Sequence, residues 1–279
     1  MSTHSADATL RGFSGHLLLV GAGKMGHALL EGWLGLGLDP RRISVFEPQP
    51  APDLAALAAR GLRLNPPQSE ARGAAAIVIA VKPQIAADVV PPLAALVGSV
   101  SVAISIMAGK PLQALEQALP GAAIVRAMPN TPAAVGRGMT VAVANQRVSS
   151  AQRELAHALL CATGAVEWIS EEALMDAVTA VSGSGPAYLF LLVEALAQAG
   201  IDAGLPPDLA AKLARETVAG SGELLRRSAL DPATLRNNVT SPGGTTEAAL
   251  AVLMGAEGLT SLMTKAVAAA TRRSRALAR

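Results

Sequence analysis

The chain has 279 residues, of which 51% are hydrophobic and 16% are charged, so it can bury the core of one large domain or two smaller ones. Its formal net charge is +2 and only 2% of its residues are aromatic, which argues against nucleic-acid binding by base stacking. The single cysteine, Cys161, excludes a disulfide framework within the chain and a metal site built from cysteines.

Two stretches bear on where the protein resides. Residues 1–14 are polar and predict a flexible arm, and without an apolar signal segment we expect a cytoplasmic protein. Residues 89–109 contain no charged residue and are long enough to cross a bilayer. Because Pro91-Pro92 and Gly98-Ser99 interrupt this stretch, we predict a helix end, a turn and a buried strand there, and no membrane partner.

The first half of the chain alternates between apolar runs typical of buried strands and stretches with helical periodicity. We predict strands in 16–20, 42–48, 74–83, 100–106, 123–127 and 138–144, and helices in 27–37, 53–61, 85–96, 111–119 and 150–163. Strands that alternate with helices in this way favour an α/β domain with a doubly wound sheet.

The second half of the chain lacks strand signals from about residue 170 onward. We predict helices in 171–181, 186–203, 207–227, 232–238, 246–254 and 259–278, three of which begin with proline. The arginines near the end favour a solvated helix C-terminus over a nucleic-acid patch. We therefore predict an arm over 1–14, an α/β domain over 15–165 and an all-α domain over 166–279.

The pattern Gly21-x-Gly23-x-x-Gly26 directly follows the first predicted strand and precedes a helix. In this context Gly21 permits the tight turn, Gly23 lets the backbone approach a pyrophosphate, and Gly26 allows close packing of helix on strand. The helix N-terminus, at Lys24 and Met25, faces the anion. The sequence thus predicts a Rossmann-like, dinucleotide-binding domain, with a tight turn that binds no ligand as the alternative.

Glu47 ends the second predicted strand, about 20 residues after the last glycine of the pattern. An acid at this spacing hydrogen-bonds the adenosine ribose hydroxyls of NAD and repels the 2′-phosphate of NADP. An ordinary surface glutamate is the alternative. Arg41 and Arg42 precede the same strand, so we expect them at its far end, away from any 2′-phosphate.

Two further segments follow buried strands, and ligands bind at the carboxyl ends of the strands in open α/β sheets. Val81-Lys82-Pro83 and Ala108-Gly109 are therefore predicted to edge the nicotinamide side of the cleft. A solvent-exposed lysine at the end of a strand is the alternative for Lys82.

Two segments rich in turn-forming residues have both a structural and a ligand-binding interpretation. Pro129-Asn130 lies in a connection stiffened by prolines and is a candidate cofactor contact, with a purely structural turn as the alternative. In the segment 182–188, Ser182 and Ser184 are candidate helix caps, and the glycines beside them permit close approach of a partner helix or a ligand.

The segment Ser241-Pro242-Gly243-Gly244-Thr245-Thr246 interrupts the helical half just before another predicted helix. A plain connector is possible, but it does not need two glycines flanked by three hydroxyls. Successive backbone N–H groups of a glycine-bearing turn at a helix N-terminus can hold a carboxylate. The segment therefore predicts an anion-binding loop.

The chemistry is constrained by what the sequence lacks. The four histidines form no metal-spaced set and no Ser/His/Asp arrangement, so we predict no metal. A dehydrogenase that oxidises an alcohol usually needs a general base, and Lys212 and Lys265 lie in no distinctive motif. Reduction of an imine fits better, because a protonated C=N already carries the positive charge that attracts a hydride.

Taken together, these motifs resemble those of pyrroline-5-carboxylate reductases in order and approximate spacing. The resemblance rests on 21–26, 81–83, 126–132, 182–188 and 241–246, and it covers nearly the whole chain after the arm. It implies reduction of 1-pyrroline-5-carboxylate to L-proline, the last step of proline biosynthesis, with NADPH or NADH as cofactor. It also implies that the all-α C-terminal domain is a dimerisation domain, giving a homodimer and often a decamer.

The same resemblance implies roles for the loop at 241–246. Ser241 and the amides of Gly243, Gly244, Thr245 and Thr246 would hold the substrate carboxylate. The Thr246 hydroxyl would hydrogen-bond the ring nitrogen as the catalytic group. Threonine does not titrate near neutrality, so this implies orientation or relay of a proton. The hydride would cross the gap between the two domains.

Two departures from the family pattern concern the cofactor. Lys24 stands where the family usually has asparagine, which adds charge near the phosphates. Glu47 stands where many relatives carry a serine or threonine that meets the 2′-phosphate. We therefore expect tolerance of, or preference for, NADH.

Other functions fit the sequence less well. β-Hydroxyacid dehydrogenases carry a catalytic lysine on a helix of the second domain, but the helix after 182–188 contains no lysine. An imine reductase for a different ring is a second alternative. A non-catalytic dinucleotide sensor would keep the glycine loop and lose the substrate loop, whereas both loops are intact here.

Overall fold

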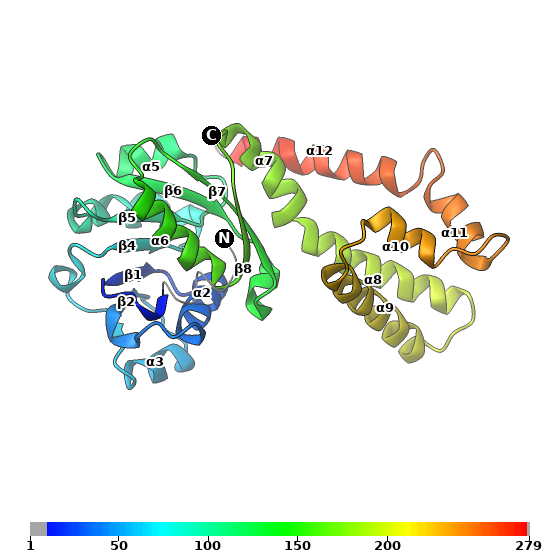
Figure 1. Cartoon of the computed structure of the whole chain (residues 1–279), viewed down its shortest axis with the longest axis horizontal. Coiled ribbons are helices and arrows are strands. Elements are labelled where there is room, and N and C mark those ends of the chain that lie inside the picture. Colours follow the sequence, from blue (N-terminus) through cyan, green and yellow to red (C-terminus); the bar gives the residue numbers. More distant parts are fainter. Residues whose placement is uncertain (1–9, 278–279) are drawn as a thin grey trace. The chain divides into compact units, whose positions relative to one another are not determined.

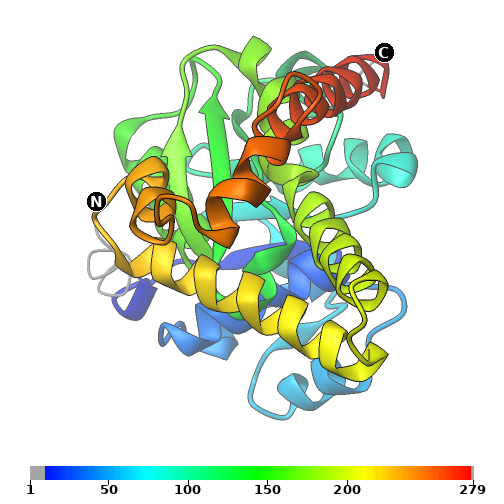
Figure 2. The same ribbon diagram turned by 90° about the vertical axis from the view of Figure 1, so that its right-hand side faces the viewer.

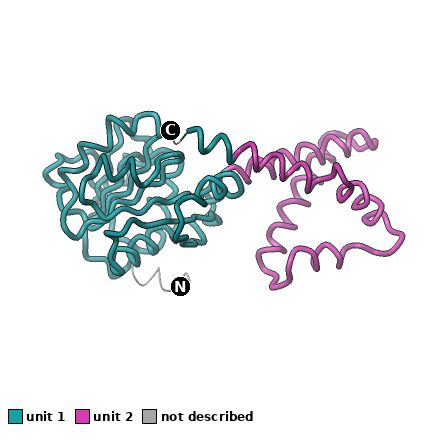
Figure 3. The backbone as a smooth tube through the Cα atoms, turned by 90° about the horizontal axis from the view of Figure 1, so that it is seen from above, with its two compact units in different colours: residues 1–183, 271–279 teal, residues 184–270 magenta. Residues whose placement is uncertain are grey.

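The computed structural model of the chain describes residues 10–277. The chain divides into two compact units, Met1–Gly183 with Thr271–Arg279 (unit 1) and Ser184–Ala270 (unit 2), coloured separately in Figure 3. Unit 1 contains the sheet, and unit 2 is helical. The predicted order, an α/β domain followed by an all-α domain, is confirmed.

Unit 1 is built on an eight-stranded sheet. Its strands are β1 (Leu17–Val20), β2 (Ile43–Phe46), β3 (Arg63–Leu64), β4 (Ala76–Ile79), β5 (Val102–Ser105), β6 (Ala123–Met128), β7 (Gly138–Ala144) and β8 (Gly164–Trp168). They lie in the order β3-β2-β1-β4-β5-β6-β7-β8, and each neighbouring pair is parallel except β6 with β7 (Figure 1). The first six positions have the strand order of Rossmann sheets, which places the topological switch point between β1 and β4.

Helices and apolar side chains cover both faces of this sheet. Leu17 and Leu19 belong to one buried cluster, whereas Leu18 and Val20 belong to the other, as the twofold periodicity of a strand requires. The helices of unit 1 are α2 (Lys24–Gly35), α3 (Pro52–Ala58), α4 (Ala86–Val89), α5 (Leu112–Ala118), α6 (Ser150–Cys161) and α7 (Met175–Val178).

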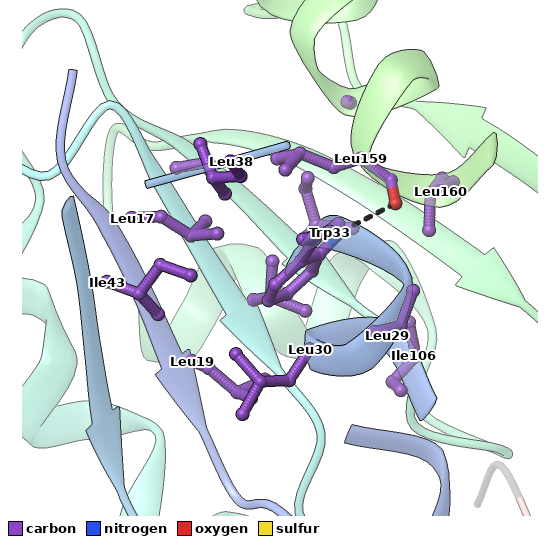
Figure 4. Packing of buried hydrophobic residues seen from close by; sticks show 14 of the residues in the cluster. Leu17, Leu19, Leu29, Leu30, Trp33, Leu38, Ile43, Ile106, Leu159 and Leu160 are labelled. Carbon is purple, nitrogen blue, oxygen red and sulfur yellow. Dashed lines mark hydrogen bonds between the residues drawn. The ribbon is translucent and has the colours of Figure 1, made fainter. Parts of the chain in front are cut away.

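The largest side chain of the core connects two of these helices. Trp33 of α2 is fully buried, and its Nε1–H donates to the carbonyl oxygen of Leu159 on α6 at 2.8 Å (Figure 4). The bond satisfies the one polar atom of the side chain, so the indole can lie in an otherwise apolar cluster.

The structure moves the boundary predicted at residue 165. β8, which was not predicted, adds a strand next to β7, and Met175 behind it is buried against Val141 and Val143. Because these contacts extend the sheet and its cover, unit 1 runs on to Gly183. The short strand β3 was also not predicted.

Two other predictions need correction or qualification. Residues 1–9 of the predicted arm lie outside the described part, but Leu10 is fully buried in the cluster that contains Trp33, so the arm is not free up to residue 14. The single helix predicted over 85–96 is instead α4 flanked by the 3-10 helices Pro83–Ile85 and Pro91–Leu96. Pro91 and Pro92 cannot donate the hydrogen bonds that would continue α4. The strand predicted after them is confirmed as β5.

Unit 2 consists of α8 (Gly185–Asp202), α9 (Pro207–Arg227), α10 (Pro232–Asn238), α11 (Thr245–Leu253) and the larger part of α12 (Leu259–Leu277). α8 and α9 pack as a helical hairpin (Figure 2). Gly200 makes this approach possible, because a Cβ added there would lie 3.2 Å from the Cβ of Ala210.

Unit 2 leaves most of its apolar surface exposed. Within 184–270, all of which the structure describes, Ala210 and Ala214 are the only hydrophobic residues that are buried. Phe190 and Leu191 of α8 are 64% and 63% exposed. The helical stretch Glu172–Asp202 is also long and apolar enough, by length and composition alone, to cross a membrane. Apolar surface on this scale marks an interaction face.

The last turns of α12 return to unit 1. The Ser274 hydroxyl donates to Asp176 Oδ1 at 2.7 Å, and the Arg275 guanidinium lies 3.7 Å from Oδ2 of the same carboxylate. Cβ of Leu277 would lie 3.5 Å from a Cβ added to Gly109. Of the arginines in the last turns of α12, Arg275 is thus exposed and also paired with a carboxylate of unit 1.

Candidate functional site: a glycine-loop cleft and a helix-start loop

The three glycines after β1 meet three different requirements. Gly21 has a φ of +89°, and a Cβ added there would lie 2.9 Å from the carbonyl oxygen of Ala80. A Cβ on Gly26 would collide with the carbonyl oxygen of Gly21. Around Gly23, by contrast, no described atom lies within 4 Å of an added Cβ. The fold therefore requires glycine at positions 21 and 26, whereas the absence of a side chain at Gly23 leaves space that a ligand could fill.

The amino end of α2 faces this open space without a cap. The helix begins at Lys24 with Gly23 in the N-cap position, and no described side chain accepts a hydrogen bond there. The first N–H groups of a helix have no partner within it and carry partial positive charge, so such an end can bind an anion. This geometry fits the pyrophosphate of a dinucleotide.

A cleft of about 970 Å³ adjoins the loop. Of the residues predicted to bind cofactor, the cleft brings together Gly21, Gly23, Lys24, Glu47, Val81 and Lys82. Its apolar wall comes from the segment after β4 and was not predicted; the wall includes Ile85, Val89, Pro92 and Leu93. These residues belong to three short helices, α4 and the 3-10 helices on either side of it, so their periodicity in the sequence gave no sign of a shared face.

Glu47 is held in place at the end of β2. Its Oε2 accepts the N–H of Ala22 at 2.8 Å, and its Oε1 accepts the N–H of Gln49 at 3.1 Å. The Asn65 side chain bonds both the N–H and the carbonyl of Glu47, each at 2.8 Å. A carboxylate held by two backbone N–H groups therefore lies in the cleft beside the glycine loop. The alternative of an ordinary surface glutamate does not account for these bonds.

Several predicted cofactor residues do not line the cleft. Met25 packs partly buried against the core, Gly26 is buried beneath the loop, and Pro83 begins the 3-10 helix after Lys82. Ala108 is exposed beyond β5, and Pro129 is buried. The sequence placed these residues near the strand ends that border the cleft. In the structure, their described contacts are with the core and the loops instead of with the cleft.

Asn130 has a structural role in the described chain. Its Nδ2 donates to the carbonyl oxygen and hydroxyl of Ser182, at 3.2 and 3.3 Å, and its Oδ1 accepts the N–H of Met139 at 2.8 Å. The amide side chain thus ties β7 to the π-helical segment Thr179–Gly183. The glycine of the same segment, Gly183, allows a close approach, because an added Cβ would lie 2.7 Å from Cε of Met128. Ser184 occupies the N-cap position of α8, but its side chain makes no capping hydrogen bond.

Substitution of two of the glycines separates folding from ligand binding. We expect Gly26→Ala to lower the free energy of unfolding by about 1–3 kcal/mol, because its methyl group overlaps backbone. Gly23→Ala should change stability by no more than about 0.5 kcal/mol but should weaken dinucleotide binding by obstructing the open space. Chemical denaturation and fluorescence titration with NADH measure the two effects. Equal losses of stability in both variants would contradict this division.

The loop ahead of α11 in unit 2 turns at Gly243, whose φ is +70°. The Gly243 N–H donates to Glu247 Oε2 at 2.7 Å, and the Gly244 N–H donates to the carbonyl oxygen of Ser241 at 3.0 Å. Two of the amides predicted to hold a carboxylate are thus already satisfied within the chain. Glu247 was not predicted, although its place three residues after the N-cap Gly244 matches the spacing of a capping box.

The free donors of this loop lie one step further along. α11 begins at Thr245, and no described side chain caps it. The amides of Thr245 and Thr246 belong to the first turn, where a helix leaves its N–H groups unpaired. Of the four amides predicted to hold a carboxylate, those of the two threonines therefore remain available at the helix start, whereas those of the two glycines are bonded within the chain. Thr246, the second residue of α11, is half-buried.

The described residues contain no group of three His, Cys, Asp or Glu side chains that could hold a metal ion. Each unit has one candidate site of its own: a cleft beside the glycine loop in unit 1, and an uncapped helix start with hydroxyls in unit 2.

Comparison with known proteins gives two family models. One, described as pyrroline-5-carboxylate reductase dimerisation, matches residues 172–277. The other, described as NADP oxidoreductase coenzyme F420-dependent, matches residues 17–109. The chain is 44% identical over 263 residues to the pyrroline-5-carboxylate reductase of Synechocystis, covering 93% of this chain and 97% of the relative. It is 39% identical to the Pseudomonas aeruginosa enzyme of that name, covering 94% and 96%.

Solved structures give the same picture. A pyrroline-5-carboxylate reductase from Coxiella burnetii superposes with a TM-score of 0.88 at 34% identity and covers 96% of this chain and 100% of its own. The Plasmodium falciparum pyrroline carboxylate reductase, solved with NADP bound, has a TM-score of 0.80 at 31% identity, covering 95% and 99%.

Proposed function

The chain belongs to the pyrroline-5-carboxylate reductase family and reduces 1-pyrroline-5-carboxylate to L-proline, and we propose a division of this task between its two units. The observation that carries the proposal is the pair of uncapped helix starts, at Lys24 in unit 1 and at Thr245 in unit 2. Each offers backbone N–H groups to an anion, the first to the pyrophosphate of a dinucleotide and the second to the carboxylate of the substrate.

Unit 1 holds a nicotinamide dinucleotide in its glycine-loop cleft. The residues that fit are Gly21, Gly23, Lys24, Glu47, Val81 and Lys82, with the amides of Met25 and Gly26 in the first turn of α2. When bound, the reduced cofactor supplies the hydride for the imine carbon. Ala108, Pro83, Pro129 and Asn130 shape the neighbouring strand ends. The fixed carboxylate of Glu47 disfavours a 2′-phosphate, which supports preference for NADH over NADPH.

Unit 2 binds and orients the substrate. The amides of Thr245 and Thr246 hold the carboxylate, and the loop of Ser241, Gly243 and Gly244 sets the position of that helix start. The Thr246 hydroxyl hydrogen-bonds the ring nitrogen and keeps the protonated imine in place. A threonine hydroxyl does not ionise near neutrality, so it orients or relays a proton and is not the ultimate acid.

The direct test is oxidation of NADH or NADPH followed at 1-pyrroline-5-carboxylate saturation, with product proline quantified separately. Proline formed in a one-to-one ratio with oxidised cofactor is expected. Cofactor binding without turnover would instead favour a dinucleotide sensor, and turnover only of a six-membered cyclic imine would favour a reductase of another ring.

Glu247 is expected to order the substrate loop. Glu247→Ala removes the bond to the Gly243 N–H from a loop with two adjacent glycines, whose ordering entropy is large. We expect KM for pyrroline-5-carboxylate to rise on the order of fivefold, with a smaller change in kcat. Glu247→Gln is the matched control, because it keeps an acceptor oxygen and should leave KM close to that of the unaltered enzyme. A fall of KM in both variants would mean that the carboxylate competes with the substrate.

Self-association follows from the dimerisation region at 172–277 together with the exposed apolar faces of unit 2. We infer a homodimer through these helices, with a decamer as the larger assembly, in the cytoplasm. An active monomer in sedimentation at assay concentration would contradict the homodimer.

A further inference from the structure

A second cavity, of about 480 Å³, lies at the edge of the sheet opposite the glycine loop. Its walls come from the residues just before β1, the residues just before β2 and the first residue of β3. These three strands are parallel neighbours, so their amino-terminal ends meet at one edge. The charged or titratable side chains that line the cavity are His16, Asp39, Arg41, Arg42 and Arg63.

One of the three arginines is neutralised within the pocket. Arg41 pairs with Asp39, with Nη2 at 2.8 Å from Oδ2 and Nε at 3.1 Å from Oδ1. This pairing lowers the pKa of the Asp39 carboxyl below its ordinary value, through the side-chain hydrogen bond first and the Arg41 backbone N–H second. Asp39 therefore stays ionised, and its negative charge offsets the positive charge of Arg41.

The other two guanidinium groups make their hydrogen bonds to backbone carbonyl oxygens. Arg42 donates to the carbonyl oxygens of Ser14 and Gly15. Arg63 Nη2 lies 3.2 Å from the carbonyl oxygen of Arg41, while its Nη1 approaches the exposed Glu70 only to 4.0 Å. Within residues 10–277, no carboxylate lies within ion-pair distance of Arg42. Two positive charges thus line the cavity; within the described residues they are offset by the 4.0 Å ion pair of Arg63 with Glu70 and by Asp39, whose carboxylate is already bonded to Arg41.

His16 could supply a third hydrogen-bond donor to the cavity, but only when its ring is protonated on Nδ1. Its Nδ1 lies 3.2 Å from Arg63 Nη2, and its Nε2 lies 3.0 Å from the hydroxyl of Ser44, which is fully buried. Because a guanidinium only donates, Nδ1 accepts and the neutral ring carries its proton on Nε2. Burial first, and the charge of Arg63 second, lower the pKa of His16 below 6.5. An anion in the cavity would oppose both effects.

We propose that this cavity binds a small dianion, a phosphoryl or sulfate group, between Arg42 and Arg63. Planar guanidinium groups bind such oxyanions through paired hydrogen bonds, and both side chains are already positioned by backbone carbonyls. Protonation of His16 on Nδ1 would release Arg63 Nη2 toward the anion. The site is separate from the cofactor cleft, since the two open at opposite ends of the same strands.

The test is calorimetric titration of the full-length enzyme with sulfate at constant ionic strength, with and without saturating NADH. We expect binding that NADH does not change and that Arg42→Gln and Arg63→Gln each weaken about tenfold, because each removes charge-assisted hydrogen bonds. Arg72→Gln, on an exposed arginine outside both cavities, is the matched control and should bind as the unaltered enzyme does. Thermal unfolding of each variant checks that the fold is retained.

Two results would overturn the proposal. One is the absence of sulfate binding by the unaltered enzyme. The other is binding that Lys24→Gln or NADH abolishes while Arg42→Gln and Arg63→Gln leave it intact, which would assign the ion to the glycine loop.

A pH series adds a readout that a structural role would not produce. A bound dianion favours the imidazolium form of His16 and raises its pKa, so affinity should increase as the pH falls below neutrality and level off once the ring is protonated. The groups facing His16 are Arg63 on β3 and, before β2, Asp39, Arg41 and Arg42, none of which changes charge in that range. His16→Asn should remove the pH dependence, and its persistence would contradict the assignment of the proton to His16.

Discussion

Thr246→Ala is expected to lower kcat/KM for pyrroline-5-carboxylate by roughly 100-fold, mainly through kcat. The side chain is the half-buried hydroxyl of the uncapped turn that opens α11. In the proposed mechanism its loss leaves the protonated ring nitrogen without an orienting partner, whereas the backbone amide that we propose binds the carboxylate is kept. Steady-state assays over a range of substrate concentrations separate the two parameters.

The neighbouring Thr245 provides the comparison. Thr245→Ala also keeps its amide but removes an exposed hydroxyl, so it should cost much less than Thr246→Ala. Thr246→Ser, which retains the hydroxyl, should recover most of the activity. If Thr246→Ala kept the unaltered kcat/KM, the hydroxyl would have no part in the reaction.

Glu47→Ser is expected to shift the ratio of kcat/KM toward NADPH over NADH by on the order of 10- to 100-fold. The carboxylate is held beside the glycine loop by the N–H groups of Ala22 and Gln49, where we propose that it repels a 2′-phosphate. Removing it relieves repulsion of the phosphate and also frees the Ala22 N–H. The ratio is measured with both cofactors on the same preparation.

Glu47→Gln distinguishes the charge from the hydrogen bond. Glutamine keeps an acceptor oxygen for Ala22 but carries no charge, so most of the shift toward NADPH should remain if repulsion is its cause. A serine variant that shifts while the glutamine variant does not would point to loop geometry. A strong NADPH preference in the unaltered enzyme would contradict the role given to Glu47.

Local sequence patterns were sufficient for much of the fold. The glycine pattern after a buried strand predicted the β1–α2 turn, and helix start signals predicted α9 and α10 at the bounds the structure has. These features depend on residues close together in the chain. Periodicity and proline or glycine position were enough to place them.

The missed features depend on partners far apart in the sequence. β8 is a strand because β7 offers an edge to pair with, and Asn130 is a tether because Ser182 and Met139 surround its amide. The same holds for Asn65, which fixes Glu47 from another strand end. The change at the substrate loop has a local cause: the Gly243 N–H, predicted to bind a carboxylate, donates instead to Glu247 four residues later.

The return of α12 to unit 1 makes unit 2 an insertion in topological terms. The chain leaves unit 1 at Gly183 and re-enters it at Thr271, where Ser274 bonds to Asp176. During synthesis on the ribosome, the sheet can therefore form early, but the contacts of unit 1 with the last turns of α12 form only after the helical insertion has emerged. A premature stop within α12 would consequently leave the α/β unit incomplete, although the sheet and its glycine loop lie far upstream.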